Sequence, residues 1–367
     1  MNIVCDRQSL IEAVSNVQRA VSTKSTIPAL EGILLRASGS ALFLAGYDLD
    51  LGVTTTITAD VREAGEIVLT AKLFSEIVRK LPGDEVSIAT DAKLNTVIHS
   101  GVAEFTIMGL SAEEYPEIPS INDGVSFLLP QDTLRSMIRQ TLFSVAQVDA
   151  ARPVHTGTLF ELEQGTLRLV SVDGSRLALR CETVTSSETL QFVVPGKTLN
   201  EVLKLLSDED TPVSLAVGRR HIVMEISGYA VISRLLDGEF LAYQKAIPQQ
   251  VATTVRVRTR DLIDAVDRAS LVINDRVKVP LVCNFRDNHI GVSCTTPLGS
   301  ASDQIPAVID GDESEMGFNS RFLLDALKNT ETDEVRIELN GPFSPMKVLP
   351  PEGESFLFLI LPVRLKR

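Results

Sequence analysis

One helix-and-strand unit occurs three times along this chain. The segment TAKLFSEIVRKLPGDEVSI, which begins at Thr70, returns as PGKTLNEVLKLLSDEDTPVSL and as NSRFLLDALKNTETDEVRI. The first basic residues of the three predicted helices, Lys72, Lys197 and Arg321, are 125 and 124 positions apart. Because this spacing is nearly constant, it predicts three similar units in tandem.

A second, weaker helix pattern recurs with nearly the same spacing. Its three copies are DRQSLIEAVSNVQRAV, PQDTLRSMIRQTLFSV and RTRDLIDAVDRASLV, with leading residues Leu10, Leu134 and Leu262. The period is longer than the ~20 to 50 residues of solenoid repeats. It matches the size of a globular domain, about 100 to 150 residues. Three globular domains therefore fill all 367 residues.

The remainder of each unit reads as strands. In GILLRASGSALFLAGYDLDLGVTTTI, apolar residues recur every two positions around a Gly-Ser turn, and similar segments follow in the other two units. Each unit thus combines two helices with mostly antiparallel sheet, an α+β fold. Proline-rich and polar segments near Pro119 and Pro248 predict domains of residues 1–123, 124–250 and 251–367.

Composition narrows the functional classes. Hydrophobic residues make up 44% of the chain, yet no apolar run approaches the ~20 residues of a membrane span, and no secretory signal is readable at the start. Four scattered cysteines and four scattered histidines show no metal-ligand spacing. We expect a cytoplasmic protein with no metal, no cofactor and no membrane partner.

The charge distribution is uneven. The chain carries a net charge of -13, but the six predicted helices (7–21, 71–81, 130–145, 196–206, 258–272 and 319–330) together carry +6, so the rest carries -19. For one helix alone, a solvated polar face is the simpler interpretation. Repetition in three units favours a positive face that contacts phosphates without sequence preference.

Three segments resemble catalytic or ion-binding motifs, but each lacks a residue or a spacing that the motif requires. Gly196-Lys197-Thr198 resembles a phosphate-binding loop, but Gln191 stands where its first glycine is required. The acidic run over 310–315 lacks the ligand spacing of a calcium loop. Asp48 and Asp173 end strands without a histidine or nucleophile next to them in sequence. We therefore expect no enzymatic activity.

Several segments resemble the bacterial sliding clamps, the beta subunits of DNA polymerase III, in the order found in that family. They are AVSTKSTIPALEGI, LFSEIVRKLP, EEYPEIP, IRQTLFSV, DGSRLALR, VVPGKTL, SRLLDGEF, AVDRASL, LLDALK and LILPVRL. The resemblance implies a DNA clamp fold and a homodimeric ring of six domains, whose helices line a hole around duplex DNA. Such a ring, associated with the nucleoid, slides on DNA and tethers the replicative polymerase.

The resemblance also implies a hydrophobic pocket for short motifs of partner proteins. Those partners are the DNA polymerase III alpha-type subunit, the clamp loader, other polymerases and repair proteins. The chain departs from the common family pattern at Ser175, His155 and Leu241. The implied lining residues are His155, Val172, Gly174, Arg176, Leu177, Leu241, Lys245, Ala246, Leu359, Leu361, Pro362, Val363, Arg364 and Leu365.

Two of these residues, Leu177 and Leu361, are equally compatible with a purely structural place in the hydrophobic core. The strongly apolar run FLFLILPVRL, close to the end of the chain, favours the functional interpretation.

Two further sets of residues follow from the resemblance. A dimer contact is expected between Phe105 and Ile107 of one subunit and Leu271 and Val272 of the other. Candidate DNA contacts are Lys24, Arg79, Lys80, Arg135, Arg139, Lys197 and Lys204. Two alternatives stay open, namely an interaction scaffold that does not encircle DNA and a hydrolase that uses Asp48 or Asp173.

Overall fold

The computed structural model describes residues 1–121, 123–149, 151–186, 188–273 and 279–365. The chain forms two compact units, one made of residues 1–133 and 200–235 and the other of residues 134–199 and 236–367. None of the described helices is long and apolar enough to cross a membrane.

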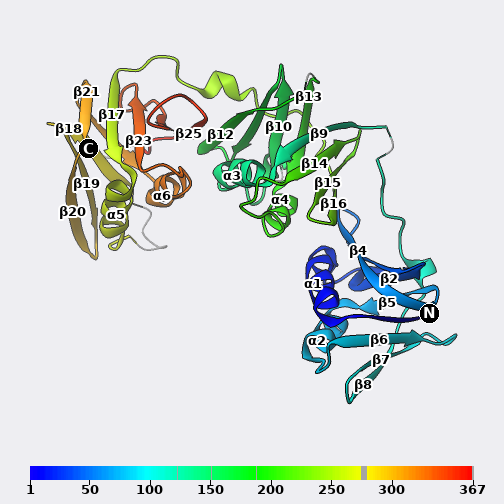
Figure 1. The fold of residues 1–367 in the computed structure, drawn as a ribbon. Coiled ribbons are helices and arrows are strands. Elements are labelled where there is room, and N and C mark those ends of the chain that lie inside the picture. Colours follow the sequence, from blue (N-terminus) through cyan, green and yellow to red (C-terminus); the bar gives the residue numbers. More distant parts are fainter. Residues whose placement is uncertain (122, 150, 187, 274–278, 366–367) are drawn as a thin grey trace. The chain divides into compact units, whose positions relative to one another are not determined.

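The first unit contains a twelve-stranded antiparallel sheet with two helices. The helices are α1 (Arg7–Val17) and α2 (Ala71–Lys80), which pack against each other (Figure 1). The central path of the sheet runs β8-β7-β6-β1-β4-β16-β15-β14-β9, and β2, β3 and β5 branch from it. The strands are β1 (Asn2–Asp6), β2 (Gly32–Ser38), β3 (Ala41–Tyr47), β4 (Leu51–Glu63), β5 (Gly65–Thr70), β6 (Glu85–Thr90), β7 (Asn95–Ser100), β8 (Ala103–Met108), β9 (Val125–Pro130), β14 (Pro212–Val217), β15 (His221–Ile226) and β16 (Tyr229–Arg234).

The second unit contains a nine-stranded sheet, a four-stranded sheet and further helices. The helices are α3 (Gln131–Leu142), α4 (Gly196–Val202), α5 (Thr259–Ser270) and α6 (Ser320–Lys328), the first two of which extend a few residues into the first unit. The larger sheet has the order β13-β10-β11-β12-β25-β24-β23-β17-β21. Its strands are β10 (Gly157–Glu163), β11 (Thr166–Val172), β12 (Arg176–Thr183), β13 (Leu190–Pro195), β17 (Thr253–Arg258), β21 (Val308–Gly311), β23 (Glu334–Leu339), β24 (Met346–Leu349) and β25 (Phe356–Ile360).

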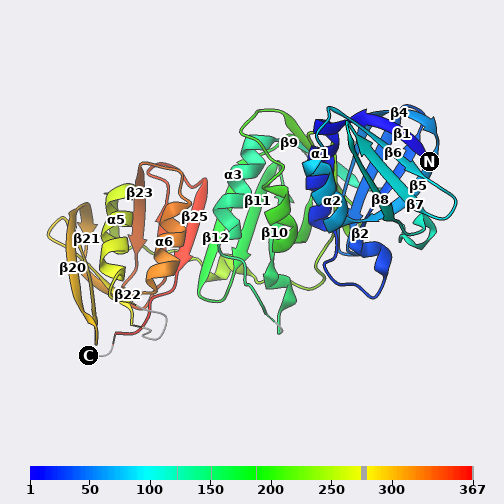
Figure 2. The ribbon, with the colours of Figure 1, turned by 90° about the horizontal axis from the view of Figure 1, so that it is seen from below.

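The smaller sheet belongs to the third repeat. Its order is β20-β19-β18-β22, and its strands are β18 (Leu281–Arg286), β19 (His289–Thr296), β20 (Gly299–Pro306) and β22 (Ser314–Phe318). Helices α5 and α6 pack side by side, and α5 contacts β19 and β20 of this sheet as well as β17 and β23 of the larger one (Figure 2). The third repeat therefore encloses its own apolar core between helices and sheets.

Consecutive repeats are joined by strand pairing. In the first unit, β4 of repeat one pairs with β16 of repeat two, for example through Val53 and Val231. In the second unit, β12 of repeat two pairs with β25 of repeat three through Leu177 and Leu359. Alternating apolar residues place one face of each strand in a core. Each of the two larger sheets is therefore continuous across one junction between repeats.

Local sequence explains where the helices begin and which face they bury. Asp6 caps α1, since its carboxylate accepts a 2.7 Å hydrogen bond from the Ser9 amide. In α2, Phe74, Ile77 and Val78 recur at helical spacing and are buried, whereas the basic residues lie on the opposite face. Burying each such apolar side chain contributes about 1.5 to 3 kcal/mol.

The α+β fold class and all six predicted helices are confirmed, each helix within a few residues of its predicted bounds. Gly196 is the first residue of α4, directly after β13, as expected for a strand-to-helix turn rather than a phosphate loop. The domain boundaries near residues 123 and 250 stay predictions.

Candidate functional site

The predicted pocket residues of the second repeat lie around the junction of β12 and β25. A tight turn precedes β12, where the Asp173 carboxylate accepts hydrogen bonds from the amides of Ser175 and Arg176 at 3.0 and 3.1 Å. Gly174 in this turn has φ +86°, a conformation that side-chain-bearing residues rarely adopt. Past the end of β25, the Leu361 amide donates to the Ser175 carbonyl at 3.0 Å. The chain terminus is thereby held against the turn.

The guanidinium of Arg176 makes most of its contacts within the protein. Its guanidinium donates to Asp173 at 2.7 Å and to Asp325 on α6 at 2.5 Å. It also lies over the rings of Phe322 and Phe143, 4.4 and 5.7 Å from their centroids. The resemblance implied that Arg176 lines the pocket, and these contacts also give it a structural role, joining repeats two and three.

His155 also makes specific contacts. It lies in a 3₁₀ turn (Pro153–Thr156), is buried, packs edge-on against Phe240 and approaches the Asp149 carboxylate at 3.3 Å. Hydrogen bonds from the Arg152 amide and from His155 hold the pKa of Asp149 below its usual range, so this carboxylate is ionised at neutral pH. The polar side chain at position 155 thus has a charged partner.

The remaining predicted lining residues separate into buried and exposed groups. Val172, Leu177 and Leu359 belong to a buried cluster that also contains Phe240 and Tyr243. In contrast, the side chains of Leu241, Leu361 and Val363 are 41 to 43% exposed, a large fraction for apolar residues. The exposed group forms an apolar surface, and the buried group packs in the core beneath strands β12 and β25.

Two exposed cations accompany this apolar surface. Lys245 follows Leu241 in a 3₁₀ turn (Tyr243–Ala246), and Arg364 follows Val363. Neither makes an ion pair with another described residue. Ala246 is exposed, while Pro362 and Leu365 are half-buried. The arrangement suits a ligand with apolar groups and an adjacent negative charge.

The interpretation of the apolar chain ending needs correction. All five residues of β25 are buried, because this strand pairs with both β12 and β24 inside the nine-stranded sheet. Most of the run therefore serves the core, and only its last part is exposed. Beyond it, the Val363 amide donates to the Gly317 carbonyl at 2.8 Å, which attaches the segment after β25 to β22.

Sequence reasoning missed several residues that shape this site. The partners of Arg176 and His155 lie far away in sequence or carry no motif, and they are Asp149, Phe240, Phe143, Phe322 and Asp325. Phe343 is 79% exposed in the loop before β24, whose Met346 pairs with Ile360 of β25. An exposed phenylalanine within GPFSP was the one readable signal among them.

The residues behind the hydrolase alternative have structural partners. Asp48 caps a turn by accepting from the amides of Asp50 and Leu51 at 3.1 and 2.7 Å, and Asp173 is paired with Arg176. Among the described residues, no cluster of His, Cys, Asp or Glu has the arrangement of a metal site. The geometry of these carboxylates is that of turn formation.

Comparison with known proteins covers the whole chain. Models of the N-terminal, central and C-terminal domains of the DNA polymerase III beta subunit match residues 1–119, 128–241 and 244–364. The chain is 35% identical to the beta sliding clamp of Bacillus subtilis, covering 99% of this chain and all of that one. The chain belongs to the DNA polymerase III beta subunit family.

Solved structures of beta sliding clamps show the same fold. A crystal structure of the Bacillus subtilis clamp aligns over the full length of both chains with TM-score 0.97 and 34% identity. A putative beta subunit from Eubacterium rectale aligns over 99% of both chains with TM-score 0.95 and 38% identity. A Pseudomonas aeruginosa clamp bound to griselimycin aligns over both full lengths with TM-score 0.94 and 27% identity.

The basic residues predicted to face DNA in a beta sliding clamp differ in their surroundings. Lys24, in a loop, and Arg79 and Lys80, in the last turn of α2, are exposed and form no ion pair within the described part of the chain. Arg139 lies 3.5 Å from Glu331, and Lys204 donates to Glu201 at 2.7 Å. Two others lie on helices, Arg135 half-buried on α3 and Lys197 exposed on α4.

The predicted dimer residues lie on an edge strand of the first unit and directly after helix α5 of the second. β8, which carries Phe105 and Ile107, is an edge strand of the twelve-stranded sheet, and Phe105 is exposed. Leu271 directly follows α5 and is 83% exposed, while Val272 packs partly against the core of the third repeat. Exposed apolar residues at an open strand edge favour association with another chain.

Proposed function

We propose that two copies of this chain associate through Phe105, Ile107, Leu271 and Val272 and close a ring around duplex DNA. The ring slides without sequence preference and keeps a bound polymerase at high effective concentration near its template. The observation that carries this proposal is the match of all three repeats, over the full chain, to the three domains of the beta sliding clamp family.

The exposed group around Leu361 is proposed as the docking site for partner proteins. Leu241, Leu361 and Val363 receive an apolar side chain, and Lys245 and Arg364 interact with acidic or polar groups beside it. The partners are an alpha-type polymerase subunit, a clamp loader, and other polymerases and repair proteins. His155 and its partner Asp149 make this site more polar than the aliphatic version expected of the family.

The proposed function requires no chemical step. The chain acts by topology and by docking, as a processivity subunit in the cytoplasm at the nucleoid. An interaction scaffold that does not encircle DNA is not favoured, because it leaves Lys24, Arg79 and Lys80, which are exposed and form no ion pair with a described residue, without a role.

Primer extension with the cognate polymerase and clamp loader tests this proposal. The wild-type protein should lengthen the products made in one binding event. Leu361→Glu should abolish this effect without loss of folding, because the side chain is exposed. Val308→Glu serves as the matched control, since Val308 is an exposed valine on β21. Equal stimulation by Leu361→Glu and wild type would contradict the docking site.

A further inference from the structure

The basic residues on the helices of the first and third repeats have different charged surroundings. On α2, the side chains of Lys72, Arg79 and Lys80 are exposed, and none makes an ion pair with a described residue. Glu76 is the one carboxylate on this helix. The outward face of α2 therefore carries a net charge of +2 and presents it to solvent.

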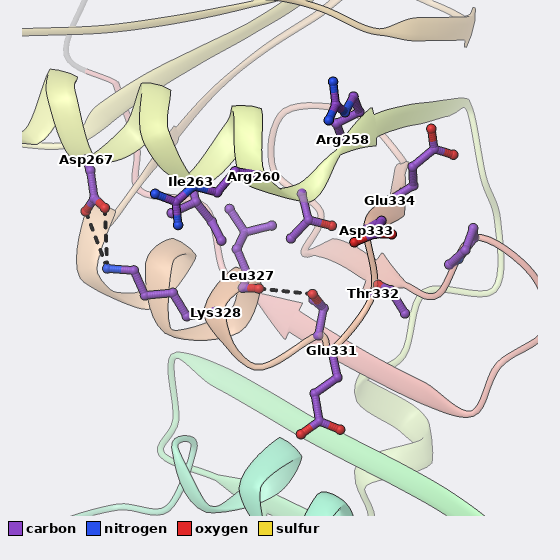
Figure 3. A pocket seen from close by; sticks show the side chains of 13 residues that line it. Arg258, Arg260, Ile263, Asp267, Leu327, Lys328, Glu331, Thr332, Asp333 and Glu334 are labelled. Atoms are coloured by element: carbon purple, nitrogen blue, oxygen red, sulfur yellow. Dashed lines mark hydrogen bonds and ion pairs between the residues drawn. The ribbon is translucent and has the colours of Figure 1, made fainter.

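Three basic residues beside the helices of the third repeat, Arg258, Arg260 and Lys328, lie in ion pairs. Arg260 lies 3.1 Å from Asp264, and Arg258 lies 4.0 Å from Asp261. Lys328 of α6 lies 3.5 Å from Asp267 of α5 (Figure 3). The three aspartates follow each other at intervals of three residues along α5. Since neighbours three apart lie on adjoining faces of a helix, they form one acidic row beside the basic side chains.

A groove of about 1230 Å³ between α5, α6 and the start of β23 brings these charges together (Figure 3). Its basic lining residues are Arg258, Arg260 and Lys328. Its acidic lining residues are Asp267, Glu331, Asp333 and Glu334. Because acidic side chains outnumber basic ones, the groove offers no net attraction to phosphate, although it contains the N-terminus of α5.

This difference matters for contact with DNA because phosphate binding depends on net charge. Exposed ion pairs contribute only about 0 to 1 kcal/mol each, so the pairs themselves need not be strong. Their members are 3 to 4 Å apart, well within the Debye length of about 8 Å at physiological salt. A phosphate near Arg260 therefore also meets the repulsion of Asp264. Beside Arg79 and Lys80 the only carboxylate of α2 is Glu76, which forms no ion pair with a described residue, so the compensation there is smaller.

We infer that phosphate contact is concentrated on α2 of the first repeat, with Lys72 as a further contact residue. On the α5–α6 face of the third repeat, the charges of Arg258, Arg260 and Lys328 are offset toward DNA by those of Asp261, Asp264 and Asp267. This inference rests on the proposed function, in which the helices face encircled DNA. A ring in which each subunit has one positively charged surface and one neutral surface contacts DNA weakly enough to slide.

The test is the diffusion coefficient of fluorescently labelled clamp, loaded on long duplex DNA, measured at several salt concentrations. The first variant, Lys72→Gln/Arg79→Gln/Lys80→Gln, should diffuse about twofold faster or more and respond less to salt, because fewer counterions are displaced. The matched control, Arg258→Gln/Arg260→Gln/Lys328→Gln, removes the same charge from exposed side chains and should diffuse like wild type.

A third variant tests the role of the acidic row directly. Asp261→Asn/Asp264→Asn/Asp267→Asn should slow diffusion about twofold or more and steepen its salt dependence, since it uncovers basic side chains. A merely structural role would not produce this gain in DNA contact. Equal acceleration by the two glutamine variants, or unchanged diffusion of the asparagine variant, would overturn the inference. Failure of wild type to stay on closed DNA would instead overturn the proposed function, and the inference with it.

Discussion

Arg176 and Asp325 form a 2.5 Å ion pair that joins the start of β12 in the second repeat to α6 in the third. Arg176→Ala would remove this pair and leave Asp173, which is mostly buried, without its cation. Removing one member of a buried pair typically costs more than the pair contributes. We expect a loss of about 2 to 4 kcal/mol in the free energy of unfolding, measured by urea titration.

Two further variants make that result specific. Arg176→Lys should recover little stability, because lysine lacks the planar group that stacks on Phe322 and donates to two carboxylates. Arg364→Ala removes an exposed arginine and should change stability by no more than about 0.5 kcal/mol. A similarly small effect of Arg176→Ala would show that the Arg176–Asp325 ion pair does not stabilise the junction of repeats two and three.

Gly46 on β3 is required by a close approach of the chain rather than by its φ angle. A Cβ atom there would lie 2.0 Å from the Val17 carbonyl oxygen, so α1 would have to move. We expect Gly46→Ala to lower the free energy of unfolding by about 3 kcal/mol or more. Gly291 on β19 is the matched control, because its Cβ would meet nothing nearer than 3.6 Å. Thermal unfolding that ranks the two variants equally would show the contact to be unimportant.

Because the thiol of Cys283 is buried, we expect the free energy of unfolding to fall at alkaline pH. Burial raises the pKa of its thiol from 9.0 to about 12. Below pH 9 the thiol is neutral in the folded and unfolded chains, so it contributes no pH dependence. Between pH 9 and 12 only the unfolded chain ionises, which favours unfolding by up to about 1.4 kcal/mol per pH unit.

Urea unfolding between pH 8 and pH 10.5 measures this effect. Cys283→Ala should lower stability at pH 8 but show a flatter decline above pH 9 than wild type. Val292→Ala creates a cavity at the residue paired with Cys283 in β19 and should retain the wild-type slope. If the two variants have the same slope, then the thiol does not account for the alkaline sensitivity.

The proposed dimer contact predicts a change of mass in solution. Leu271→Asp places a charge where an exposed leucine would be buried against the partner, which should weaken association more than tenfold. Light scattering at micromolar concentration should then report a monomer for Leu271→Asp and a dimer for both wild type and Val308→Asp. A monomeric wild-type protein would be incompatible with a closed ring of two subunits.

The repeated features of the molecule were predictable from sequence, whereas its individual contacts were not. Leu10, Leu134 and Leu262 recur at one period, and each is buried in a helix at the predicted position. The α+β class followed from the change between helical and strand periodicity. Such patterns are readable because each residue reports its own local environment.

The contacts of Arg176 and His155 depend on pairing between distant segments. Arg176 meets Asp325 only because β12 and β25 become neighbours in one sheet, and no local pattern encodes that pairing. The buried state of β25 was misread for a similar reason. An apolar run near a chain end looks available to a partner until the strands on both of its sides are known.

The central claim is that this protein binds DNA by encircling it. The most direct measurement is retention on nicked circular plasmid after loading with a cognate clamp loader and ATP, before and after a restriction enzyme linearises the circle. We predict that the clamp stays on the circle and is lost on linearisation, because a sliding ring leaves through the free ends. Equal retention on both forms, or no loading beside a control clamp that loads, would contradict encirclement.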